Sequence, residues 1–124
     1  MNQENKSEQE YFFNNVTLVG RAGRDAELKY FDSGTAKAEL SLAVNRGRSK
    51  NREEITDWFK VVLWGRQAEI AGEYVKKGSL IGIEGTIEQN KWIDESSGEQ
   101  RETYFIKASS LKLIGGKKDQ MAHA

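Results

Sequence analysis

The chain has no cysteine and no proline, and its single histidine, His123, is the residue before the last. Without cysteine there is no disulfide framework and no thiolate nucleophile. With neither cysteine nor an internal histidine, we expect no zinc site and no other metal or cofactor. The same count excludes a Ser–His or Cys–His nucleophilic pair. These absences exclude the two kinds of catalysis just named, and we expect a protein that is not an enzyme.

Long apolar runs and an excess of charge of one sign are also missing. The first ten residues, MNQENKSEQE, are polar and do not form a signal peptide. No apolar run approaches the ~20 residues that a membrane helix needs. The 19 basic residues balance 19 acidic ones, so any surface that attracts a polyanion must be local. These features predict one soluble, cytoplasmic domain without a membrane partner.

Turns in a chain without proline must be made by its 12 glycines, which favours an all-β domain. Alternation of apolar and polar residues predicts several strands. Their ranges are 14–22, 36–46, 55–64, 79–93 and 101–115, with a further extended piece at 26–31 and a turn at 32–35. One helical pattern covers 66–78 and ends at a glycine.

The resulting order of three strands, one short helix and two strands predicts a five-stranded OB-fold barrel. Gly82 and Gly85 interrupt the fourth strand, where we expect the barrel to bend as it closes. We predict that the barrel spans 14–115. Residues 1–13 then form a flexible N-terminal extension, and 116–124 a short disordered C-terminal end.

The stretch TDWFKVVLW (56–64) contains two of the three tryptophans. In a strand its side chains alternate between two faces. One face carries Phe59, Val61 and Leu63, and the other carries Trp58, Lys60, Val62 and Trp64. Burial of both indoles in the core is one interpretation, but the first face already supplies a core and a lysine seldom points into one. Two indoles around an ammonium suit the bases and phosphates of single-stranded nucleic acid.

Further basic residues lie at three other places in the chain. The predicted loop 47–54 and the residue before it have a basic residue at every second position, which is typical of a solvated loop or of a phosphate-binding one. These residues are Arg46, Arg48, Lys50 and Arg52. Lys91 and Trp92 repeat the pairing of lysine and indole in a long polar hairpin, whose tip we place at 94–100. Lys76 and Lys77 end the predicted helix, where cations also stabilise the helix dipole.

Two long segments of the sequence resemble bacterial single-stranded DNA-binding protein: NNVTLVGRAGRDAELKYFDSGTAKAELSLAVN and DWFKVVLWGRQAEIAGEYVKKGSLIGIEGTIEQNKW. The resemblance covers about 14–115. It implies an OB-fold, a homotetramer and sequence-independent binding of single-stranded DNA in replication, recombination and repair. It also implies base stacking on Trp58, Trp64 and Trp92. The resemblance further implies that four basic residues lie along the DNA path: Lys60, Arg66, Lys76 and Lys77.

The sequence departs from this family at three places. The loop NRGRSK has no aromatic residue, so a guanidinium of Arg46 or Arg48 would have to stack instead. Ala26 stands where the family often has proline. The final residues, GGKKDQMAHA, lack the family's acidic, hydrophobic tip, so we do not expect tail-dependent replication and repair partners.

Two other functions compete with DNA protection. The first is a dimeric primosomal relative that uses the same barrel mainly to dock proteins, against which the three tryptophans argue. The second is a nuclease on an OB-fold. It would need converging carboxylates, whereas the sequence offers scattered acids and the adjacent pair Glu53 and Glu54.

Overall fold

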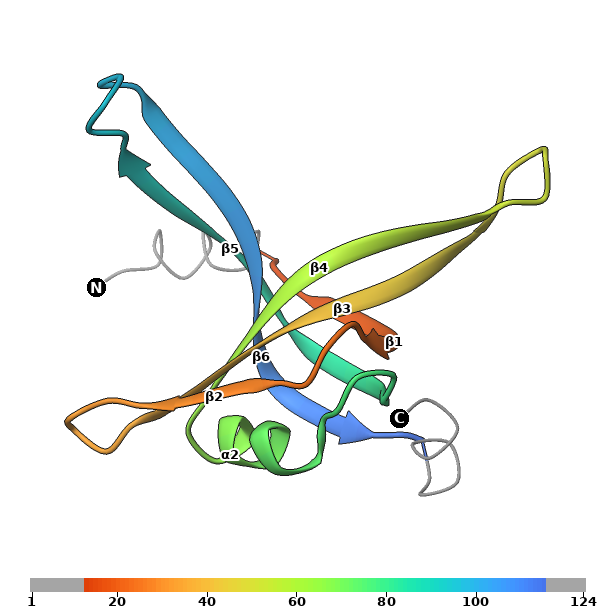
Figure 1. Cartoon of the computed structure of the whole chain (residues 1–124), viewed down its shortest axis with the longest axis horizontal. Coiled ribbons are helices and arrows are strands. Elements are labelled where there is room, and N and C mark those ends of the chain that lie inside the picture. Colours follow the sequence, from red (N-terminus) through yellow and green to blue (C-terminus); the bar gives the residue numbers. More distant parts are fainter. Residues whose placement is uncertain (1–12, 116–124) are drawn as a thin grey trace, which may run out of the picture.

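The computed structural model describes residues 13–115, so nearly all of the predicted extension 1–13 and the whole of the end 116–124 lie outside the described residues. Six strands and one helix follow one another along the described part of the chain (Figure 1). They are β1 (Val16–Ala22), β2 (Glu27–Tyr30), β3 (Ala36–Arg48), β4 (Glu54–Trp64), α2 (Gly65–Tyr74), β5 (Leu80–Ile93) and β6 (Gln100–Leu113).

Five of the strands close into a barrel. Hydrogen bonds join them in the order β1-β5-β6-β4-β3, and pairing of β1 with β3 at Arg21 and Ala22 completes the circle. β4 and β6 run parallel at Val61 and Val62, whereas the other neighbours are antiparallel. The short strand β2 adds to β3 alone. This is the predicted OB-fold barrel, with α2 between its third and fourth strands.

The core lies inside the barrel and is built from the alternating apolar residues of its strands. Along β3 the side chains alternate between buried and half-exposed, as the sequence predicted. The large side chains that are fully buried are Leu40, Leu42, Val61, Leu63, Ile81, Ile83 and Val75. At Gly85 the pairing of β5 with β6 shifts register, and a Cβ there would collide with the carbonyl oxygen of Lys107. Glycine is therefore required at this bend.

The helix α2 closes one end of the barrel but is shorter than predicted. It ends at Tyr74 rather than at Gly78, because Val75 is already extended. A turn follows it, in which the Lys76 N–H donates to Ser79 Oγ at 2.9 Å and Gly78 has φ +89°. Lys76 and Lys77 therefore lie beyond the helix and do not cap it, which corrects the prediction.

Two long hairpins project from the barrel, one formed by β3 and β4 and the other by β5 and β6 (Figure 1). The first is more regular than predicted, since the ladder continues through Arg48 and restarts at Glu54. A bulge at Asn45 makes this possible: its side-chain oxygen accepts the Gly47 N–H at 2.7 Å, and Gly47 has φ +124°. The loop is therefore 49–53 instead of 47–54.

Two smaller observations complete the fold. The Ala26 N–H donates to the Val75 carbonyl at 3.1 Å. A proline has no N–H to donate, so proline at this position would lose the bond. None of the helices found in residues 13–115 is long and apolar enough to cross a membrane.

Candidate nucleic-acid interface

Strand pairing places all three tryptophans on one continuous outer face of the sheet. Trp58 and Trp64 share a face of β4 with Val62, which pairs with Lys107 of β6. Lys107 in turn pairs with Thr86 of β5, on the same face of that strand as Trp92. The three indoles come from the strand and the hairpin predicted to carry them, and 62%, 40% and 46% of their surfaces are exposed. They do not belong to the buried core.

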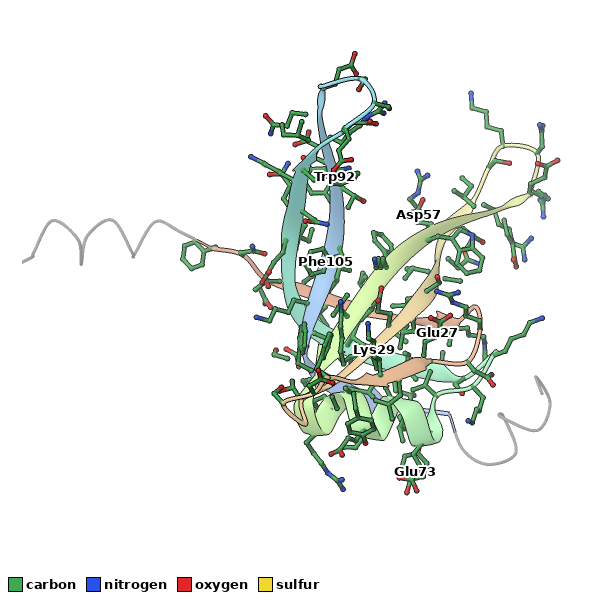
Figure 2. The ribbon with its side chains drawn as sticks, turned by 60° about the vertical axis from the view of Figure 1, so that its left-hand side comes forward. Glu27, Lys29, Asp57, Glu73, Trp92 and Phe105 are labelled. Carbon is green, nitrogen blue, oxygen red and sulfur yellow. The ribbon has the colours of Figure 1, made fainter. Side chains whose placement is uncertain are left out.

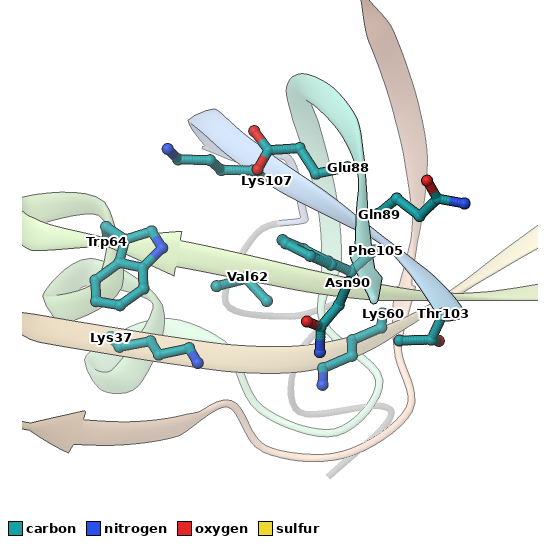
Figure 3. Close-up of a pocket in the computed structure, with 10 residues that line it drawn as sticks. All are labelled: Lys37, Lys60, Val62, Trp64, Glu88, Gln89, Asn90, Thr103, Phe105 and Lys107. Carbon is teal, nitrogen blue, oxygen red and sulfur yellow. The ribbon is translucent and has the colours of Figure 1, made fainter. Parts of the chain in front are cut away.

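A hollow of about 470 Å³ opens on this face between the two pairs of strands (Figure 3). One wall belongs to β3 and β4 and the other to β5 and β6. The lining residues are Lys37, Lys60, Val62, Trp64, Glu88, Gln89, Asn90, Thr103, Phe105 and Lys107. Val62 is buried although it shares a face with the tryptophans. With three lysines and one acid around an indole and a phenyl ring, the hollow suits an anionic ligand that carries flat rings.

The indole of Trp58 rests on the backbone of the connection between β1 and β2. A Cβ built at Gly23 would lie 2.5 Å from Trp58 Cζ3, so only glycine lets the ring come this close. The Gly23 N–H donates to the Ser41 carbonyl at 2.8 Å, which fixes this support to β3. One side of the indole is thus held by the protein, and the ring is still 62% exposed.

Trp64 stands in a second aromatic group at the other end of β4. Its ring stacks on Phe31 with a centroid separation of 5.9 Å and an angle of 20° between the planes. Lys37 Nζ lies 5.3 Å from the centroid of the Trp64 ring, and Lys29 Nζ lies 5.0 Å from that of Phe31. Cations over aromatic faces are attracted by the ring quadrupole. The group therefore combines two rings and two ammonium groups.

Glu39 lies between the lysines of the face and binds them. Its carboxylate is 3.0 Å from Lys60 Nζ and 3.8 Å from Lys37 Nζ. The hydrogen bond from Lys60 is the main reason why the pKa of Glu39 lies below its ordinary value, and it outweighs the opposing effect of partial burial. Glu39 is therefore ionised at neutral pH and competes with any phosphate for Lys60.

The hairpin of β5 and β6 presents Trp92 but not the lysine beside it. Trp92 pairs with Arg101, and Lys91 pairs with Glu102 on the opposite face of the strand. The prediction grouped Lys91 with Trp92 because they are adjacent in sequence. Strand alternation separates them instead. Figure 2 shows Trp92 well out along this arm, away from the barrel.

The four basic residues of the other arm divide into two pairs. Arg46 binds Asp57 at 2.9 Å, and Arg48 binds Glu54 at 3.5 Å, both across the β3–β4 ladder. Because Asp57 alternates with Trp58, Arg46 lies on the reverse of the tryptophan face. Lys50 and Arg52 stand in the loop, and within residues 13–115 neither has an ion pair.

The remaining predicted contacts lie around the helix. Arg66 is exposed in the first turn of α2 and is 3.9 Å from Glu69. Lys76 and Lys77 are exposed in the turn after the helix. The Lys77 N–H donates to Asp25 Oδ1 at 2.8 Å, which ties this turn to the connection that supports Trp58.

The sequence prediction missed several residues of this surface, among them Phe31, Lys37, Phe105 and Lys107. Each belongs to a strand or turn that was predicted correctly, with the expected alternation. What the sequence did not supply was the pairing register that brings them beside β4. For Phe31 a signal was present, because it follows Lys29 by two residues and hence shares a strand face with a cation.

Comparison with known proteins agrees with this geometry. Residues 13–114 match the model of the Single-strand binding protein family. Single-stranded DNA-binding protein 1 of Synechocystis sp. is 52% identical over 106 residues, covering 86% of this chain and 87% of the relative. Its namesake in Nostoc sp. is 50% identical over 107 residues, with the same coverage of each chain. The single-stranded DNA-binding protein of Thermosynechococcus vestitus is 40% identical over 86% of both chains. The chain therefore belongs to the Single-strand binding protein family.

Proposed function

We propose that this chain binds single-stranded DNA without sequence preference and protects it during DNA replication, recombination and repair. The observation that carries the proposal is the common face of Trp58, Trp64 and Trp92 beside a hollow lined by lysines. Stacking tolerates every base because every base has a π face. The names of the matched relatives support this function.

In the proposed mechanism aromatic rings contact the bases and lysines contact the phosphates. The exposed indoles stack on the bases of a single strand. In a duplex the bases are paired and stacked on one another, so they are not accessible to the indoles. Lys60, Lys37 and Lys107 in the hollow contact the phosphates that link those bases. The DNA-binding domain in this proposal is 14–115. The proposed mechanism is binding alone and includes no catalytic step.

We further propose that the protein works as a homotetramer. A small hollow of about 120 Å³ opens above Gly82, between β1, β5 and the end of β6. Its lining is apolar at Leu18, Val19, Ile83 and Ile114 and polar at Thr17, Glu84, Ser110 and Lys112. Val19 and Ile114 are half-exposed there, and both approach the position that a Cβ of Gly82 would take. A second copy of the chain would cover this surface. The dimeric primosomal alternative is less well supported, because the curated relatives above are named as DNA-binding proteins.

Titration of the intrinsic tryptophan fluorescence with oligo(dT) tests the proposal. We expect strong quenching at saturation, since each indole stacks on a base. Trp58→Ala, Trp64→Ala and Trp92→Ala should each weaken binding by ~1–3 kcal/mol. Circular dichroism of each variant serves as the control for folding. Unchanged emission, with binding demonstrated independently, would refute the stacking role.

A further inference from the structure

We infer that Phe31 is an additional base-contacting residue and that Lys29 beside it contacts a phosphate. The DNA path would then extend from β4 onto the turn between β2 and β3. This inference rests on the proposed binding of single-stranded DNA and adds a binding position to it.

The first support is the geometry of the two rings. Phe31 and Trp64 are nearly parallel, with centroids 5.9 Å apart. A separation of this size means an offset stack, in which each ring overlaps its neighbour only in part. Phe31 accordingly keeps 38% of its surface exposed and Trp64 keeps 40%. The two rings thus form one stepped platform, wide enough for more than a single base.

The second support is an arrangement of charge that costs stability in the free protein. Lys29 and Lys37 are direct partners in the antiparallel pair of β2 and β3. Like charges directly opposite each other destabilise a sheet. Lys37 has Glu39 at 3.8 Å to offset this repulsion, but Lys29 has no ion pair among residues 13–115. A phosphate beside Phe31 would supply the missing negative charge.

The third support is that the turn holds Phe31 in place before any ligand binds. The Phe31 N–H donates to the Thr35 carbonyl at 2.9 Å, and the Gly34 N–H donates to the Phe31 carbonyl at 2.8 Å. Gly34 has φ +91°, which favours glycine at this position. A ring that is already oriented loses little conformational entropy on stacking.

Another role for Phe31 would be mechanical support of Trp64, without contact to DNA. The two roles differ in what the side chain must be. Support requires only an apolar side chain of similar size, so leucine would suffice. Base stacking requires an aromatic ring, so tryptophan would suffice and leucine would not.

The test compares Phe31→Ala, Phe31→Leu and Phe31→Trp with the wild type by anisotropy of a labelled oligo(dT). Tyr30→Ala is the matched control. It removes a neighbouring exposed ring from the same hairpin, on the other side of the strand, where the Tyr30 hydroxyl donates to Glu69 of α2 at 3.0 Å. Thermal melting of each variant monitors folding.

We expect Phe31→Ala and Phe31→Leu to bind DNA about 5- to 10-fold more weakly, the lower end of the effect of removing one stack. Phe31→Trp and Tyr30→Ala should bind like the wild type. Normal binding by Phe31→Ala or Phe31→Leu would overturn the inference, as would an equal loss in Phe31→Trp or Tyr30→Ala. If the wild type itself fails to bind oligo(dT), the proposed function fails instead, so the two failures are distinguishable.

Discussion

Gly23 shows how one residue without a side chain orients one of the three indoles of the interface. Its α-carbon lies directly beneath the Trp58 indole, and an added methyl group would stand 2.5 Å from Cζ3. The backbone there is held by a hydrogen bond to β3, so the indole rather than the strand must move. A displaced indole no longer offers the same face to a base.

We therefore expect Gly23→Ala to weaken binding of oligo(dT), although it removes no side chain of the proposed interface. The loss should be smaller than that of Trp58→Ala, because a displaced ring keeps part of its stacking surface. In a Trp58→Ala background the same glycine substitution should have no further effect, since the two changes act through one ring. Anisotropy titrations of the single and double variants measure this. Additive losses would contradict the account.

We expect Glu39, on the same face, to weaken DNA binding, because its carboxylate forms an ion pair with Lys60. Glu39→Gln should strengthen DNA binding by roughly 1.5- to 5-fold, the usual contribution of an exposed ion pair. The salt dependence should also steepen by about 0.7 in log–log slope for one more neutralised phosphate. Glu73→Gln is the control, because Glu73 is exposed on the far side of the helix from the arms (Figure 2). Equal effects of the two substitutions would show a general charge effect and not competition for Lys60.

The β3–β4 arm shows, at the scale of an element, that the spacing of basic residues in the sequence does not reveal which of them form ion pairs. Arg46, Arg48, Lys50 and Arg52 look equivalent in the sequence, at every second position. The ladder separates them, because the first two face Asp57 and Glu54 across the strands and the last two lie in the loop. Only the loop pair is available to phosphates without breaking an ion pair.

We therefore expect the two pairs of basic residues on this arm to contribute unequally to the salt dependence of DNA binding. Lys50→Gln with Arg52→Asn should flatten the log–log slope by about 0.7 for each phosphate that the variant no longer neutralises. Asparagine is chosen because Arg52 has φ +66°, which asparagine tolerates. Arg46→Gln with Arg48→Gln should flatten it less. Binding titrations over a range of salt concentrations measure both, and a greater change in the second variant would reject the assignment.

The strands and the helix were predicted from the sequence better than the contacts between them. Alternation along β3 and β4 identifies the buried face, because burial selects apolar residues at every second position. The end of α2 was predicted too late, because the turn after it is held by hydrogen bonds to residues distant in sequence. The Lys77 N–H donates to Asp25, and the Gly78 N–H donates to the Ala22 carbonyl. The contact of Phe31 with Trp64 depends on strand register, which a single sequence does not reveal.

At the scale of the whole molecule, the two arms leave the barrel in different directions (Figure 1). Trp58 belongs to a strand of one arm and Trp92 to a strand of the other. On the proposed function, a single barrel would offer DNA a bent path and not a straight groove. Part of the outer surface takes no part in this path. Around Gly82, exposed Val19 and Ile114 form an apolar patch that is bordered by Thr17, Glu84 and Lys112, and an apolar patch with a polar rim is typical of a surface covered by another protein.

Val19 is the residue of choice for testing whether a second copy covers that surface. It pairs with Gly82, and 53% of its surface is exposed, so an aspartate there causes no clash inside the barrel. A carboxylate buried in an interface is costly, even though Lys112 lines the same hollow. We expect light scattering at micromolar concentration to give a tetramer mass for the wild type and a smaller mass for Val19→Asp. Tyr74→Asp, which replaces an exposed apolar ring on α2, should keep the wild-type mass. A monomer mass for the wild type would reject the tetramer, and a dimer mass would favour the primosomal alternative. An unchanged mass in Val19→Asp would place the interface elsewhere.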